Sequence, residues 1–62
     1  MVRTDAKSIK KGKIPDVNYL LVWDKAEGKD FADAINILAE MGWSIVQIWG
    51  LTSSHFGLFR RN

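Results

Sequence analysis

The 62-residue chain contains no cysteine, one proline and one histidine. Neither disulfide bonds nor thiolate metal sites can therefore stabilise a chain close to the lower size limit for a self-sufficient core. A single histidine leaves only scattered carboxylates to complete a metal site. No apolar run approaches the roughly 20 residues that span a bilayer, and the charged N-terminus lacks the apolar segment of a signal peptide. We predict one cytoplasmic domain without a metal or other cofactor.

Aromatic and aliphatic side chains are abundant. Hydrophobic residues make up 47% of the chain and include three Trp, three Phe and one Tyr. Each aromatic side chain can bury roughly 150–250 Å². A chain this short needs either such a core or the association of subunits, and we expect both.

The charges are segregated along the chain. Residues 1–13 carry five basic residues and one acidic residue, whereas residues 14–59 carry two basic and six acidic residues. Arg60 and Arg61 then form a basic pair before the final Asn62. Residues 1–16 are predicted to form a flexible basic N-terminal tail, because Gly12 and Pro15 would interrupt a helix that begins near Thr4. Residues 17–62 are predicted to form the folded domain.

The domain is predicted to have the element order β-α-β-β. Residues 17–23 are rich in β-branched, aromatic and aliphatic residues and favour a strand. Residues 31–41 repeat apolar side chains every three or four positions, which indicates an amphipathic helix. Two further strands are expected at residues 43–49 and 55–60, with turn-forming residues 50–54 between them. We therefore predict an α+β fold, a three-stranded sheet with one helix on one face.

The ends of the predicted helix have plausible caps. Asp30 is the expected N-cap, with its carboxylate accepting from free amides of the first turn, and Gly42 is expected to end the helix in the left-handed conformation. Trp43 would then pack near Leu38. An alternative start at Asp24 would place Gly28 inside the helix, so we prefer the later start.

One face of such a sheet has no helix to cover it. Alternation places Tyr19, Leu21 and Trp23 on one face of the first strand, and the later strands carry apolar residues on both faces, with Trp43, Ile45, Gln47 and Trp49 expected together on one of them. An uncovered apolar face usually marks an interface, and we expect a homo-oligomer, most simply a dimer that stacks faces or pairs edges. The alternative is that residues 1–16 fold back over this face. The candidate interface residues are Tyr19, Leu21, Trp23, Trp49 and Phe59.

Residues 39–46, with the sequence AEMGWSIV, carry a resemblance. Gly42-Trp43 followed by Ile45-Val46, together with the ending Phe59-Arg60-Arg61, resembles the small bacterial and phage proteins grouped as domain of unknown function 4177. Met41 and Ser44 depart from that pattern, in which acidic or polar residues are usual. The resemblance implies a β-α-β-β fold over residues 17–61 and implies no chemistry.

The residues that could carry catalysis do not form a recognisable arrangement. His55 follows Ser53 and Ser54, but neighbours on a strand point to opposite faces, and no nucleophile elbow surrounds the serines. Gly28-Lys29 precedes a helix without the pattern of a phosphate-binding loop. We predict that the protein is not an enzyme and has no small-molecule substrate.

Three functions stay open from the sequence. The first is a non-catalytic, homo-oligomeric interaction module that binds an unidentified partner protein through an apolar sheet face or edge, helped by the basic tail. The second is a nucleic-acid-binding accessory protein, and the third is a peripheral adaptor at an anionic membrane surface or a membrane protein. The basic tail could also serve only for solubility. The candidate phosphate or partner contacts are Arg3, Lys7, Lys10, Lys11, Lys13, Arg60 and Arg61.

Overall fold

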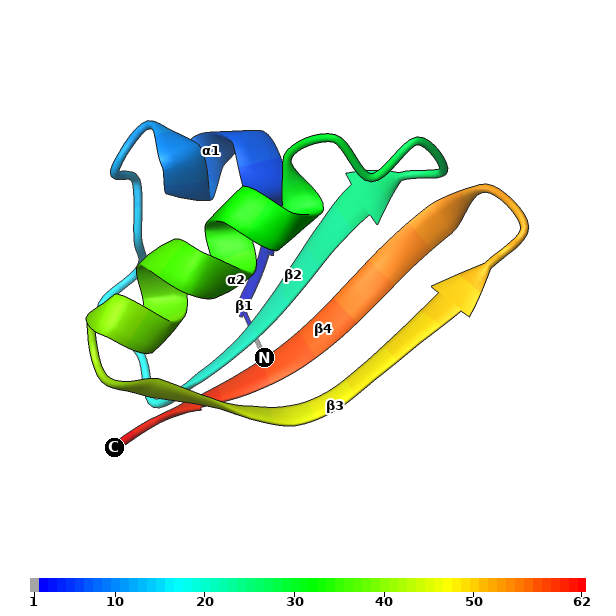
Figure 1. The fold of residues 1–62 in the computed structure, drawn as a ribbon. Coiled ribbons are helices and arrows are strands. Elements are labelled where there is room, and N and C mark those ends of the chain that lie inside the picture. Colours follow the sequence, from blue (N-terminus) through cyan, green and yellow to red (C-terminus); the bar gives the residue numbers. More distant parts are fainter. Residues whose placement is uncertain (1) are drawn as a thin grey trace.

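The computed structural model describes residues 2–62, which form one mixed four-stranded sheet with two helices on one side of it (Figure 1). The elements are β1 (Val2–Asp5), α1 (Ala6–Lys10), β2 (Tyr19–Lys25), α2 (Phe31–Glu40), β3 (Trp43–Leu51) and β4 (Ser54–Arg61). In the sheet the strand order is β1-β2-β4-β3, where β1 is parallel to β2 and the other neighbours are antiparallel. The predicted α+β class is confirmed. The prediction of three strands and one helix is wrong, because a fourth strand and a second helix precede them.

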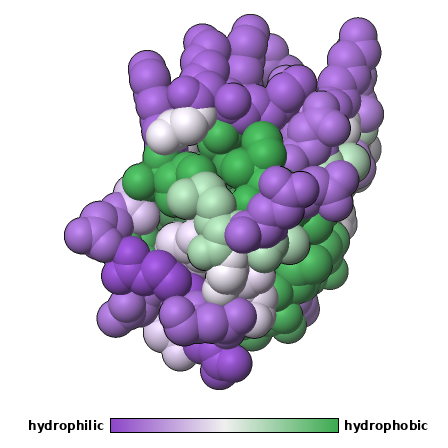
Figure 2. Space-filling view, turned by 60° about the vertical axis from the view of Figure 1, so that its left-hand side comes forward, coloured by the Kyte–Doolittle hydropathy of each residue, from purple (hydrophilic) through white to green (hydrophobic). Residues whose placement is uncertain are grey.

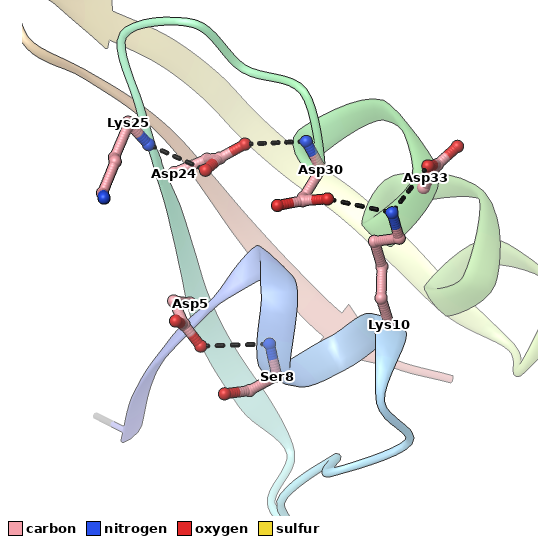
Figure 3. Close-up of polar contacts among 7 residues, drawn as sticks. All are labelled: Asp5, Ser8, Lys10, Asp24, Lys25, Asp30 and Asp33. Atoms are coloured by element: carbon pink, nitrogen blue, oxygen red, sulfur yellow. Dashed lines mark hydrogen bonds and ion pairs between the residues drawn. The ribbon is translucent and has the colours of Figure 1, made fainter.

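The N-terminal segment accounts for that difference. We expected residues 1–16 to be a flexible tail, but residues 2–10 form β1 and α1. The carboxylate of Asp5 accepts a hydrogen bond from the Ser8 amide (3.1 Å), which caps the start of α1 (Figure 3). Gly12 has a φ of 84° and donates to the Ile9 carbonyl, while the next amide donates to the Ser8 carbonyl. Gly12 thus ends a short helix instead of preventing it.

The following four elements occur in the predicted order, with shifted boundaries. β2 starts at Tyr19 rather than at residue 17, and β3 continues to Leu51, so the turn before β4 consists of Thr52 and Ser53. Gly42 has a φ of 92° at the end of α2, as predicted. Asp30 does precede α2, but its side chain makes no capping hydrogen bond. Its Oδ1 accepts from Lys10 Nζ instead.

The hydrophobic core lies between the sheet and both helices. α1 and α2 contribute small and large apolar side chains to it, and β2 and β4 supply most of the residues beneath them. The buried set consists of Ala6, Ile9, Leu20, Val22, Phe31, Ala34, Leu38, Trp43 and Phe59. Two of these residues come from α1, so the N-terminal segment is part of the core. We call this face of the sheet the helix side.

A β-bulge in β3 changes which side chains share a face. Ile45 pairs with Phe59, but the next paired residue is Gln47, opposite Leu58, which leaves Val46 as the extra residue. Paired residues of neighbouring strands point to the same side of a sheet. Gln47 therefore points away from the helix side, whereas Ile45 points towards it. Our expectation that residues 43, 45, 47 and 49 share one face is wrong beyond Ile45.

Candidate interaction surfaces

The side of the sheet opposite the helices carries a row of aromatic side chains. Trp23 on β2 pairs with Phe56 on β4, and Phe56 pairs in turn with Trp49 on β3. The Trp49 and Phe56 rings are stacked, with centroids 5.5 Å apart and an interplanar angle of 14°. All three side chains are half-buried. An aromatic strip thus crosses three strands.

Two further rows lie beside this strip. In one, Leu21 pairs with Leu58 and with Arg3, and in the other Tyr19 pairs with Arg60. The register extends this side of the sheet to Lys25 and Leu51 at its far end. We call this surface the open face, and its residues are Arg3, Asp5, Tyr19, Leu21, Trp23, Lys25, Ser44, Gln47, Trp49, Leu51, Ser54, Phe56, Leu58 and Arg60.

Four of the five residues predicted for an interface lie on the open face: Tyr19, Leu21, Trp23 and Trp49. Phe59 does not, because it points into the core on the helix side and is fully buried. Phe56 and Leu58 take its place. The alternation within β4 already places Phe59 on the opposite face from Phe56 and Leu58. This pattern in the sequence indicates Phe56 and Leu58, and not Phe59, as interface residues.

The outer edge of the sheet at β3 forms a second apolar surface. Ile45, Val46 and Ile48 are exposed by 49%, 51% and 45% respectively. β3 is nine residues long and contains no charged residue. The opposite edge strand, β1, has only four residues and includes Arg3 and Asp5. Charge and short length protect an edge against pairing with another chain, so β1 has both protections, whereas β3 has only its bulge at Val46.

Apolar atoms also reach the surface on the side of the molecule where α2 ends, between hydrophilic side chains (Figure 2). Among the apolar residues packed against the core, Ile14, Val17, Ile35 and Ile37 are only partly buried. Polar side chains interrupt this apolar surface, in contrast to the uncharged strand β3.

The predicted basic contacts do not all remain available. Lys10 forms ion pairs with Asp30 (2.9 Å) and Asp33 (3.2 Å), which join α1 to α2 (Figure 3). Its hydrogen bond to Asp30 and, to a smaller extent, its hydrogen bond to Asp33 raise the pKa of Lys10. Arg61 lies 2.6 Å from Asp16 and 5.8 Å from the centre of the Trp43 ring. Both side chains therefore already have partners within the protein.

The other five basic candidates divide between two locations. Arg3 and Arg60 belong to the open face. Lys7 is exposed on α1, and Lys11 and Lys13 are exposed in the segment that follows α1. The structure thus separates basic residues that we expected to act as one tail.

A depression of about 190 Å³ lies between α1, β2 and the start of α2. Its carboxylates hold the backbone in place. Asp24 accepts from the amides of Lys25 (2.8 Å) and Asp30 (3.1 Å), and Asp5 caps α1 (Figure 3). Hydrogen bonding from Ser8, chiefly from its side chain, lowers the pKa of Asp5. The carboxylates of Asp5 and Asp24 therefore act mainly to stabilise the fold.

His55 lies on the helix side, against Gly28 and Phe31. A Cβ atom at Gly28 would lie 2.7 Å from the His55 Cδ2 atom, and the centres of the His55 and Phe31 rings are 5.7 Å apart. The imidazole is thus a packing element over the loop before α2. Within residues 2–62, no group of three or more His, Cys, Asp or Glu residues is placed to hold a metal ion.

Neither helix of the described region is long and apolar enough to cross a membrane. Comparison of the chain with protein-family models, with curated proteins and with solved structures finds no match. The resemblance to domain of unknown function 4177 therefore stays a prediction.

Proposed function

We propose that the protein is a small non-catalytic interaction module that self-associates, and that strand β3 is its contact with a second copy. The observation that carries this proposal is the edge at β3, which is long, uncharged and apolar. The outer backbone groups of an edge strand can pair with a strand of another chain. Edge pairing in the antiparallel sense would join two four-stranded sheets into one of eight strands.

A second copy fits this edge better than a charged partner does. A symmetric contact places each residue of the strand near residues of an identical strand, and like charges opposite each other would destabilise it. β3 contains no charge that could repel its own copy. Ile45 and Ile48 lie on the helix side but remain exposed there. A paired second copy would cover part of both side chains and remove apolar area from water.

Light scattering of the purified protein over a range of concentrations tests the proposal. We expect a dimer for the natural chain, and at least about a tenfold weaker dimer for Ile48→Lys, because this change places two like charges at the symmetric contact. Ile48 pairs with Gly57 on the helix side, so the substitution leaves the open face unchanged.

Met41→Lys is the matched control. Met41 is 56% exposed and follows α2 instead of belonging to β3, so this variant should remain dimeric. A natural chain that stays monomeric at several hundred micromolar, or equal dissociation of both variants, would contradict the proposal. A monomer would leave the β3 edge to a strand of a different protein.

A further inference from the structure

The open face combines aromatic rings with a net positive charge. Arg3, Lys25 and Arg60 belong to it, and the one carboxylate whose strand position points to the same side, that of Asp5, is occupied in capping α1. The remaining acidic residues lie on α2, in the loops or on the helix side of β2: Asp16, Asp24, Glu27, Asp30, Asp33 and Glu40. Most of the negative charge thus lies off the open face, and Asp5, Asp24 and Asp30 approach its Trp23–Lys25 end, where they line the depression.

Of the seven aromatic residues, three lie in the core and four lie on the open face. Phe31, Trp43 and Phe59 are buried in the core. Tyr19, Trp23, Trp49 and Phe56 belong to the open face, where Tyr19 is 51% exposed. Single-stranded nucleic acids are bound by surfaces of this composition, on which aromatic side chains stack against bases and basic side chains contact phosphates.

The positions of these groups suit a strand of nucleotides that runs along β2. Tyr19 and Trp23 point to the same side of β2 and are four residues apart, roughly 13 Å. Arg60 is beside Tyr19, and Arg3 is beside Leu21, between the two aromatic positions. Aromatic faces for bases therefore alternate with guanidinium groups that can pair with phosphates.

We propose that the open face binds single-stranded nucleic acid by stacking bases on Tyr19 and on the Trp23–Phe56–Trp49 row, with Arg3 and Arg60 contacting phosphates. A second copy of the chain fits this face less well, since face-to-face stacking would bring the basic residues Arg3, Lys25 and Arg60 of one copy near those of the other, and like charges repel. The inference does not rest on pairing at β3, because the β3 edge and the open face are different surfaces.

The test measures fluorescence anisotropy of a labelled oligothymidylate of about 15 nucleotides, titrated with the full chain at about 50 mM salt and then at rising salt. We expect saturable binding, and binding at least about tenfold weaker to a duplex, because paired bases are not free to stack. Tyr19→Leu should weaken binding by about fivefold or more.

Two double variants with the same change in charge separate the open face from general electrostatic attraction. Arg3→Gln with Arg60→Gln removes charge from the open face, and Lys11→Gln with Lys13→Gln removes it elsewhere. The first should lower the slope of log affinity against log salt by about 1.4, whereas the second should leave it nearly unchanged. Circular dichroism of each variant checks that the fold is retained.

Four results would overturn the inference. Three of them come from the binding assay: no binding at about 50 mM salt, equal binding of single strand and duplex, or equal weakening by both double variants. The fourth is that Tyr19→Lys dissociates an oligomer of the chain, as measured by light scattering. The last result would show that a second copy of the chain covers the open face.

Discussion

Gly57 of β4 lies directly beneath Phe31 of α2, since a Cβ atom at position 57 would lie 3.3 Å from the Phe31 Cζ atom. The same Cβ atom would lie 2.8 Å from the Cε1 atom of Phe59, which is fully buried. The absence of a side chain at position 57 therefore lets both aromatic rings occupy the space above the middle of the sheet.

Gly57→Ala should destabilise the protein by about 1–3 kcal/mol, because the added methyl group would lie 2.8 Å from a ring carbon of the buried Phe59 and overpack the core. For a domain of this size, each kcal/mol lowers Tm by about 4–8 °C. Thermal unfolding followed by circular dichroism measures the change. Gly50→Ala is the control, because its methyl group would make an ordinary contact, 3.6 Å from His55 Nδ1. Equal Tm values for the two variants would show that Gly57 is not needed for packing.

Ile9→Ala should cost about 2–5 kcal/mol, the range for truncating a buried aliphatic side chain. Ile9 is fully buried although it belongs to the segment that we expected to be a mobile tail. A chain of this length has a total stability of only about 3–9 kcal/mol, so this one change could remove most of it. Urea unfolding measures the loss. Lys11 is exposed, and Lys11→Ala should change stability by less than about 0.5 kcal/mol. An equal effect of both substitutions would indicate that the segment is a mobile tail.

Protonation of Asp5 should make the protein less stable in acid. Its pKa is lowered in the folded state, so its contribution is present above the unfolded pKa of about 3.9 and is lost as the pH falls through the folded pKa. Asp5→Asn keeps a capping oxygen and should retain stability at pH 7 while showing a smaller loss in acid. Asp5→Ala should cost about 0.5–2 kcal/mol at pH 7. Urea unfolding at several pH values distinguishes the three proteins, and identical acid profiles would argue against this role of the carboxylate.

Lys10→Gln should weaken the connection between α1 and α2. The pKa of Lys10 is raised, so its contribution is complete below the unfolded pKa of about 10.4 and disappears as the pH rises through the folded pKa. The Tm difference from the natural chain should therefore be modest at pH 7, and smaller in about 1 M salt, where exposed charges are screened. Lys29→Gln is the control, since its partner Glu27 and Lys29 itself are exposed by 73% and 82%. A Tm difference that does not respond to salt would assign the effect of Lys10 to packing.

Local patterns in the sequence were sufficient to predict the elements from β2 to β4. The spacing of apolar residues identified α2, and the glycine after Met41 marked its end, because both signals arise within a few residues. α1 was missed because a helix of five residues is too short to show a period. Its ends were nevertheless visible, with Asp5 three residues before Ser8 and Gly12 shortly after the helix.

The candidate surfaces depend on contacts between distant residues, and these were harder to predict. The position of β4 between β2 and β3 makes β3 an edge, and no local pattern reports strand order. The ion pair between Lys10 and Asp30 joins residues 20 positions apart, so Asp30 had to be interpreted from its neighbours and was assigned a capping role. The open face was predicted for four of its residues because strand alternation is a local property.

The extra residue Val46 reverses the alternation of side chains between the two faces along β3. Before the bulge, odd-numbered residues face the helices, and after it the even-numbered residues do. A strand of the same residues without the bulge would place Trp49 on the helix side and Ile48 on the open face, whereas deletion of Val46 would remove the bulge and leave both orientations unchanged. Which side chains the protein presents depends on the length of this strand as much as on its composition, and an alignment with a related chain that lacks the bulge pairs residues of like orientation only where it leaves a gap at this position.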